Sequence, residues 1–305
     1  MKIVSLLPSA TEIVYALDLS EDLVGVTHEC DHPPAARAKP CVSTTSLSLD
    51  DGVAPAAVDR LVSEKVASGE PLYVLDERRI RELQPDLILA QDLCKVCAVP
   101  SGQVTDALDK IGCSADVVSL DPSTVDEILD GIVAVGSAAG REELAGELVR
   151  SLGARVEAVA TKASSLPVPR VLALEWPEPP FAGGHWVPEM IELAGGADVL
   201  GTKGAPSRRV SWDEVAAAAP EVVVYMPCGY GLAGAAGQAH CLFEVPPFRS
   251  TPAAREGAVF AVDASAYFSR PGPRVVDGLE ILAWALHPES FPNPPAGTVA
   301  RIAPG

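Results

Sequence analysis

The stretch that decides the fold is residues 122–165, PSTVDEILDGIVAVGSAAGREELAGELVRSLGARVEAVATKASS. Apolar residues recur in it at helical spacing, and no strand-like run interrupts them. Glycine inside a helix costs about 1 kcal/mol relative to alanine, so a bend is expected at Gly136 or Gly140. The prolines of LPVPR, residues 166–170, then end the helix. The pattern predicts a long helix that links two larger parts of the chain.

Short apolar runs alternate with amphipathic segments on both sides of this helix. The predicted strands are residues 2–7, 22–27, 86–91 and 115–120 before it and residues 170–175, 221–226 and 258–263 after it. Predicted helices begin near Ser9, Asp76 and Ser101, and others lie within 185–196, 211–220 and 275–286. This alternation is typical of βα units around mostly parallel sheets. We predict an α/β protein with an N-terminal lobe at 1–121, a linking helix at 122–165 and a C-terminal lobe at 166–305.

Composition narrows the classes of partner. The 305 residues are 48% hydrophobic, enough for a sizeable core, and 41 acidic residues against 23 basic ones give a formal charge of −18. No basic run interleaved with aromatic residues occurs, so we expect neither nucleic acid nor an anionic membrane surface as partner. The pattern carries no signature of an oligomeric state.

The N-terminus and the cysteines indicate a compartment. The first apolar run is broken by Pro8, Ser9, Thr11 and Glu12, unlike a signal peptide, and it predicts a strand. Seven cysteines, an odd number, fit free thiols better than a disulfide framework. We therefore expect a cytoplasmic protein, or a periplasmic or extracellular one if a leader has been removed.

Reactive side chains follow the predicted strands. Ligands of doubly wound sheets bind outside the carboxyl ends of the strands, so these positions are the candidate site. In the first lobe they are Pro8, Ser9 and Thr11, then His28, Glu29 and Cys30, then Gln91, Asp92, Cys94 and Cys97. In the second lobe they are Trp176, Phe181, His185 and Trp186, then Cys228 and Tyr230, then Tyr267, Phe268 and Arg270. Ser9 with Glu12 three residues later also predicts a capping box for the first helix.

Cys94 and Cys97 in QDLCKVCAVP, residues 91–100, have the spacing of a metal or redox pair. A structural four-cysteine zinc site needs a second such pair, and none is present. Structural cysteines, a ligand or metal contact, and thiol exchange therefore stay open. If His28, Cys30, His185 or Cys228 converges on the same point, the donor set suits zinc or an iron–sulfur cluster.

The stretch EWPEPPFAGGHW, residues 175–186, places aromatic side chains among prolines and glycines, outside any strand or helix period. This pattern favours a binding wall over a core segment. No serine nucleophile elbow, phosphate-binding loop or dinucleotide fingerprint is present. We therefore expect a binding protein rather than an enzyme.

Five stretches carry a resemblance to a known family. They are IVSLLPSATEIVYALDLSEDLVGVTHECDHP (3–33), LQPDLILAQ (83–91), SLDPSTVDEILDGIVAVG (119–136), ELAGGADVLG (192–201) and SRPGPRVVDGLEILAWALHP (269–288). They resemble periplasmic binding proteins of vitamin B12 and iron–siderophore transporters, especially the cobalamin-binding type. The resemblance implies two Rossmann-like lobes joined by a long α-helix. It also implies a large ligand held between the lobes, touching Pro8 to Thr11, the loop after Ala90, the aromatic stretch and the segment before Pro271.

The leading hypothesis is a binding protein for a corrinoid such as cobalamin, or for a related metal tetrapyrrole. The alternative is a cysteine-rich metalloprotein or enzyme with zinc or an iron–sulfur cluster in the same cleft. The resemblance further implies acidic residues that dock on arginines of a membrane transporter. Here the first-lobe loop offers Asp92 and then cysteines and a lysine, which argues against docking.

Overall fold

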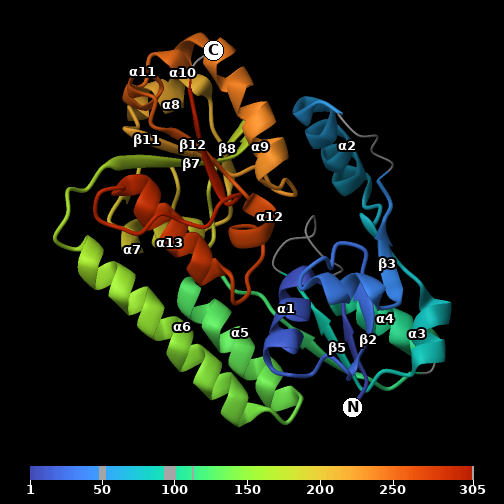
Figure 1. Cartoon of the computed structure of the whole chain (residues 1–305). Helices are drawn as coiled ribbons and strands as arrows, with labels where there is room; N and C mark the ends of the chain where they lie inside the picture. Colours follow the sequence, from blue (N-terminus) through green and yellow to red (C-terminus); the bar gives the residue numbers. More distant parts are fainter. Residues whose placement is uncertain (48–52, 93–100, 112, 304–305) are drawn as a thin grey trace. The chain divides into compact units, whose positions relative to one another are not determined.

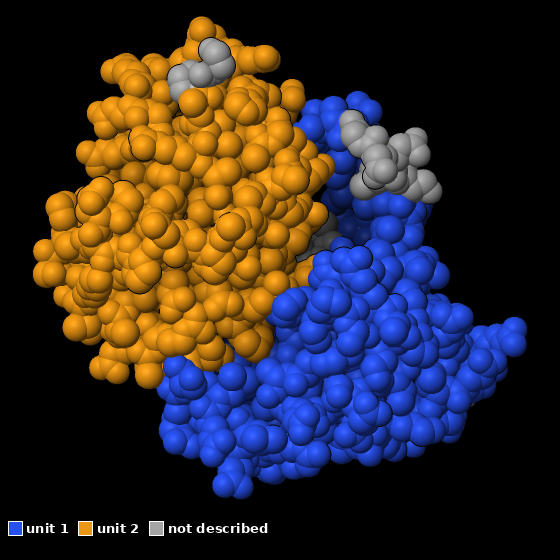
Figure 2. All heavy atoms as spheres, in the orientation of Figure 1, with its two compact units in different colours: residues 1–122, 127–151 blue, residues 123–126, 152–305 orange. Residues whose placement is uncertain are grey.

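The computed structural model describes residues 1–47, 53–92, 101–111 and 113–303 (Figure 1). The chain divides into two compact units, which Figure 2 shows in blue and orange. Unit 1 contains Met1–Pro122 and Glu127–Ser151, and unit 2 contains Ser123–Asp126 and Leu152–Gly305.

The centre of unit 1 is a six-stranded sheet of order β4-β3-β2-β1-β5-β6. Its strands are β1 (Ile3–Ser5), β2 (Leu23–Thr27), β3 (Cys41–Thr45), β4 (Tyr73–Leu75), β5 (Leu87–Ala90) and β6 (Asp116–Ser119). All neighbours are parallel except β3 and β4, which are antiparallel. The four strands predicted in this part of the chain are confirmed. β3 and β4 were missed because they are short and not bounded by a clear apolar period.

Helices connect the strands of this sheet (Figure 1). They are α1 (Pro8–Ala16), α2 (Pro55–Ser68), α3 (Glu77–Leu83) and α4 (Ser101–Ile111), with a 3₁₀ turn η1 (Pro34–Ala38). The predicted capping box at Ser9 is wrong, because α1 begins one residue earlier with Leu7 as its N-cap and no side-chain cap. Proline has the backbone angle of a first helical residue, so Pro8 occupies that position. Asp76 does cap α3, accepting from the backbone N of Arg79 at 2.9 Å.

The linking segment forms two helices, α5 (Val125–Ala138) and the 22-residue α6 (Glu142–Ala163). The single continuous helix predicted there is therefore interrupted, at one of the two glycines expected to bend it. Gly140 has a φ of +65°, a left-handed conformation that ends helices and that glycine adopts without strain. Gly136 instead allows α5 and α6 to pack closely, because a Cβ at this position would clash with the Cβ of Ala145.

Unit 2 contains a seven-stranded sheet of order β10-β8-β7-β11-β12-β13, with β9 paired to β7. Its strands are β7 (Arg170–Pro177), β8 (Pro180–Ala182), β9 (Ala197–Asp198), β10 (Arg208–Arg209), β11 (Val222–Tyr225), β12 (Val259–Val262) and β13 (Val299–Ile302). β7, β11 and β12 are parallel, as predicted, whereas β8, β10 and β13 join in antiparallel pairs.

The remaining segments of unit 2 are mostly helical. They are α7 (Val187–Leu193), α8 (Trp212–Ala218), α9 (Leu232–Ala239), η2 (His240–Glu244), α10 (Pro246–Arg249), α11 (Pro252–Glu256), α12 (Ala264–Tyr267) and α13 (Val275–Leu286). A capping box does occur here, between Ser211 and Glu214 at the start of α8. No helix in the described part of the chain is both long and apolar enough to cross a membrane.

Each unit has its own hydrophobic core beside its sheet. In unit 1 the core contains Val4, Ile80 and Ile88, and in unit 2 it contains Leu174 and Phe248, all almost completely buried. Fully burying such a side chain contributes about 1.5–3 kcal/mol. The central strands are covered on both faces, which explains why they appear in the sequence as continuous apolar runs.

Candidate functional site

The strand order locates a switch point in each unit. In unit 1 the chain passes from β1 to β2 on one side and later adds β5 on the other side of β1. In unit 2, the parallel partners β9 and β11 lie on opposite sides of β7. Ligands of open α/β sheets bind outside the carboxyl ends of the strands at such points. The segments after β1 and β5, and those after β7 and β11, are therefore the candidate site of each unit.

Hydroxyl groups and a thiol line the end of β1. Thr11 Oγ1 donates to Ser5 Oγ at 2.9 Å and lies 3.0 Å from the sulfur of Cys30. Ser5 Oγ in turn donates to the carbonyl of Leu7 at 2.9 Å. Thr11, Ser9 and Cys30 have exposed fractions of only 0%, 2% and 3%. These three predicted site residues are therefore buried within the loop, where Thr11 contacts Ser5 and Cys30. Pro8 is partly exposed.

His28 and Glu29 follow β2 and are exposed. His28 Nδ1 lies 3.3 Å from Thr27 Oγ1, which also accepts from Ser43 Oγ at 2.8 Å. The imidazole is also 6.2 Å from the ring of Tyr73. The neighbouring hydroxyl groups thus orient the imidazole at the edge of unit 1.

The end of β5 holds Gln91 and Asp92. Gln91 is buried, and its side-chain amide donates to the carbonyl of Leu120 at 3.0 Å. Asp92 is exposed, accepts from Ser119 Oγ at 3.3 Å, and its backbone N donates to Asp121. The predicted pair Cys94 and Cys97 lies outside the described residues, and whether it faces a ligand stays a prediction.

Aromatic side chains mark the switch point of unit 2. Trp176 lies beyond the last residue of β7 that pairs with β11, and its ring centroid is 6.0 Å from that of Tyr230, which follows β11. Phe181 pairs with Trp176 across the β7–β8 hairpin and has the guanidinium of Arg209 5.4 Å from its ring centroid. All three rings are partly exposed. Together, Trp176, Phe181 and Tyr230 are called the aromatic edge below.

The aromatic edge contains an unpaired donor. The indole Nε1 of Trp176 is buried and has no hydrogen-bond partner among the described residues. An unsatisfied buried polar group costs about 1–3 kcal/mol. An acceptor supplied by a ligand would remove this cost.

Glu175 fixes the loops next to the aromatic edge. Its carboxylate accepts from Ser207 Oγ at 2.5 Å and from the backbone N of Gly184 at 3.2 Å. A Cβ on Gly184 would lie 2.2 Å from the backbone N of Ser207, so only glycine allows this approach. The next residue, His185, has a φ of +53° and donates its backbone N–H to Ala205.

Burial lowers the pKa of His185. The neutral imidazole, which is the form that can bind a metal, therefore persists to lower pH than in a solvated histidine. Its ring lies 5.8 Å from that of Trp186.

Two other predicted aromatic residues lie behind the surface. Trp186 is 6% exposed and donates from Nε1 to the carbonyl of Phe268 at 2.9 Å, and Phe268 is itself 2% exposed. They fasten the start of α7 to the end of α12. Tyr267 and Arg270 are partly exposed, and Tyr267 has the guanidinium of Arg274 5.6 Å from its ring centroid. Cys228 is exposed after β11, with its backbone N donating to Glu175.

A metal cluster finds no support in the described residues. No three histidine, cysteine or acidic side chains come together there in a way that could hold a metal ion. Cys30 is buried against a threonine hydroxyl, as a structural cysteine would be. The described residues therefore do not support the zinc or iron–sulfur alternative.

Sequence reasoning missed the β7–β8 hairpin and the residues that fix it. Prolines at 177, 179 and 180 obscured the strand pattern, although the aromatic residues on either side of a short proline turn are a hairpin signal. Glu175 and Ser207 were also missed, because their contact joins positions 32 residues apart in the sequence.

Residues 3–266 match the model of the periplasmic binding protein family, and the chain belongs to that family. A vitamin B12-binding protein of Vibrio cholerae is 27% identical over 286 residues, 92% of this chain and 86% of the relative. An uncharacterized ABC transporter substrate-binding lipoprotein of Bacillus subtilis is 25% identical, covering 95% of this chain and 81% of its own.

A solved structure shares the fold. The periplasmic heme-binding protein of Pseudomonas aeruginosa superposes with a TM-score of 0.73 at 21% identity, covering 99% of this chain and 98% of that chain. The predicted α/β fold and the predicted family are thus confirmed, and the family supports a ligand-binding role. The cytoplasmic location, the absence of transporter docking and the cleft between the lobes stay predictions.

Proposed function

We propose that this protein binds a corrinoid, cobalamin or a close analogue, with the aromatic edge of unit 2 as one contact surface. The observation that carries the proposal is the contact of Trp176 with Tyr230 at a switch point, together with the indole N–H of Trp176, which has no hydrogen-bond partner among the described residues.

The chemistry of a corrinoid suits this edge. A macrocycle presents a broad apolar face, and each buried aromatic side chain contributes 150–250 Å² of contact area. Amide groups around the corrin rim supply carbonyl acceptors, and one of these could pair with the Trp176 Nε1 donor. The partly exposed rings of Phe181 and Tyr230 extend the apolar surface on the same side of the sheet.

The relatives support the same class of ligand. The Vibrio cholerae relative is a vitamin B12-binding protein and matches over most of both chains. The Bacillus subtilis relative, an uncharacterized substrate-binding lipoprotein of an ABC transporter, supports a substrate-binding role.

Titration of the purified protein with cyanocobalamin tests the proposal. We expect a saturable change in the corrin absorption spectrum and a calorimetric stoichiometry of one ligand per chain. Hemin, titrated in parallel, distinguishes a corrinoid site from a general tetrapyrrole site, and the corrinoid should bind more tightly. The proposal fails if cyanocobalamin, aquocobalamin and cobinamide all give no saturable heat or spectral change.

A further inference from the structure

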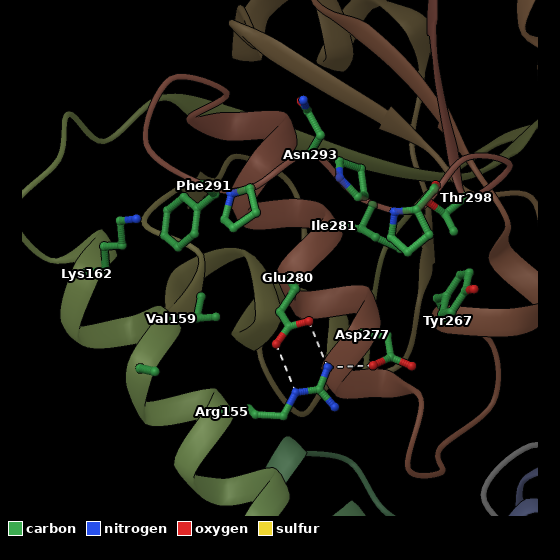
Figure 3. Close-up of a pocket in the computed structure, with 14 residues that line it drawn as sticks. Arg155, Val159, Lys162, Tyr267, Asp277, Glu280, Ile281, Phe291, Asn293 and Thr298 are labelled. Carbon is green, nitrogen blue, oxygen red and sulfur yellow. Dashed lines mark hydrogen bonds and ion pairs between the residues drawn. The ribbon is translucent and has the colours of Figure 1, made fainter.

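A cavity of about 550 Å³ lies within unit 2 (Figure 3), and no residue of the aromatic edge is in its lining. Its walls come from one face of α6, one face of α13 and the segment 291–298. The volume is within the range of about 300–1,000 Å³ typical of small-molecule sites. The lining includes the apolar side chains of Val159, Ile281 and Phe291 and three prolines.

One end of the cavity has an excess of negative charge. Arg155 on α6 binds Glu280 through two hydrogen bonds of 2.9 and 2.7 Å and Asp277 through one of 2.6 Å. These carboxylates raise the pKa of Arg155, so the guanidinium stays charged. Two carboxylates against one guanidinium leave a formal charge of −1. The second oxygen of Asp277 makes no hydrogen bond or ion pair with the described residues, and the side chain is 39% exposed.

The other end carries the opposite charge. Figure 3 shows Lys162 beside Phe291, at the opposite end from Asp277. The ammonium of Lys162 lies 4.9 Å from the centroid of the Phe291 ring and forms no ion pair with the described residues. A carboxylate could therefore bind this ammonium without displacing an existing partner.

The distance between the two ends sets the length of a ligand. Arg155, the partner of Asp277, and Lys162 are seven residues apart on α6, which corresponds to about 10 Å between their backbone positions along the helix axis. An extended peptide advances about 3.3–3.6 Å per residue, so about three residues span this distance. A ligand with a cation at the Asp277 end, an apolar body and an anion at the Lys162 end matches the cavity in charge and length.

We propose that this cavity is a second binding site, specific for a short apolar peptide of about three residues with free termini. The peptide ammonium pairs with Asp277, the peptide carboxylate pairs with Lys162, and the apolar side chains lie over Val159, Ile281 and Phe291. None of the three residues of the aromatic edge lines the cavity, whereas Tyr267, another candidate residue from the sequence, does.

The test mixes the tripeptide Ala-Leu-Ala with the 305-residue protein. Binding is measured by calorimetry and by NMR chemical shift changes. We expect saturable binding, weakened about fivefold by N-acetylation and about fivefold by C-amidation, the size expected of one partly exposed ion pair. In the Asp277→Asn variant, N-acetylation should have no further effect, while C-amidation keeps its effect. In the Lys162→Gln variant the pattern should be reversed.

Two controls separate the possible outcomes. Thermal unfolding of both variants confirms that they fold, and the Trp176→Ala variant should bind the tripeptide as the unmodified protein does. Absence of saturable binding up to millimolar peptide overturns the proposal. So does binding in which blocking either terminus has the same effect in all variants. Cyanocobalamin titration of the same samples reports on the corrinoid proposal separately.

Discussion

The switch points of the two units have the same topology and opposite chemistry. Around β1 in unit 1, Ser5 and Thr11 are buried polar residues that hydrogen-bond to one another. Around β7 in unit 2, Trp176, Phe181 and Tyr230 are partly exposed rings with an unpaired indole donor. Hydrogen bonds between buried groups stabilise a loop. A ligand at the rings would instead bury their apolar surface and supply an acceptor for the indole N–H. Ser5 and Thr11 therefore stabilise the loop after β1, whereas the rings around β7 form the contact surface that we propose for the ligand.

The largest expected effect is on ligand binding at the aromatic edge. Trp176→Ala removes a central ring and its N–H donor, and we expect corrinoid affinity to fall by about 2 kcal/mol, roughly thirtyfold. Calorimetric titration with cyanocobalamin measures the change. Trp284→Phe is the control, because Trp284 is not part of the aromatic edge and donates to Asn293. This variant should bind cyanocobalamin as the unmodified protein does. Equal losses in both variants would contradict the assignment of the aromatic edge.

A smaller effect is expected on the stability of unit 1. Thr11→Val removes the hydroxyl that donates to Ser5 and contacts Cys30, in a fully buried position. We expect the free energy of unfolding to fall by about 1–2 kcal/mol, measured by urea denaturation. Thr161→Val, at an exposed position of α6, is the control and should change the free energy of unfolding little. An unchanged midpoint for Thr11→Val would show that this network does not stabilise the loop.

The next effect is a pH dependence that arises in unit 2. Burial lowers the pKa of His185 in the folded state, so below the unfolded value of about 6.5 the unfolded chain binds the proton more readily. Stability should therefore fall as the pH decreases from about 7 to about 5. His185→Asn, which tolerates the positive φ, should reduce this slope in urea denaturation at several pH values.

Some slope should remain in that variant, since burial also lowers the pKa of His287. The control is Thr161→Val, which removes no titratable group and should leave the slope unchanged. If His185→Asn leaves the slope as it was, His185 is not the group that titrates.

The smallest effect concerns the ion pairs of α6 and α13. Arg155→Lys loses the forked hydrogen bonds to Glu280 and should lower stability by about 0.5 kcal/mol, because the groups are partly exposed. Arg78→Lys, in the highly exposed pair with Glu82, is the control and should give no measurable change. Urea denaturation in low and high salt distinguishes the two, since salt should reduce the difference between Arg155 and its variant.

The sequence predicted the central strands and most helices, because their burial on both faces produces continuous apolar runs. The short strands β3, β8 and β10 were not predictable in this way, since their pairing depends on neighbours distant in the sequence. The same limit applies to the site. The sequence pattern showed which candidate residues follow the strands. It did not show which of them are exposed, since Thr11, Trp186 and Phe268 are almost completely buried.

The α/β class followed from the apolar periodicity of the sequence, and the family followed from the five stretches that resemble it. The residues next to strand ends were candidates for the site, and the tertiary structure shows which of them are buried and hydrogen-bonded within the fold. It pairs Thr11 with Ser5 and Cys30, and it leaves the indole N–H of Trp176 without a partner in the part of the chain that the structure describes. It also brings Arg155 to Asp277 and Glu280 across 122 and 125 residues of sequence. Hydrogen bonding and burial depend on contacts between distant segments, and local pattern does not carry them.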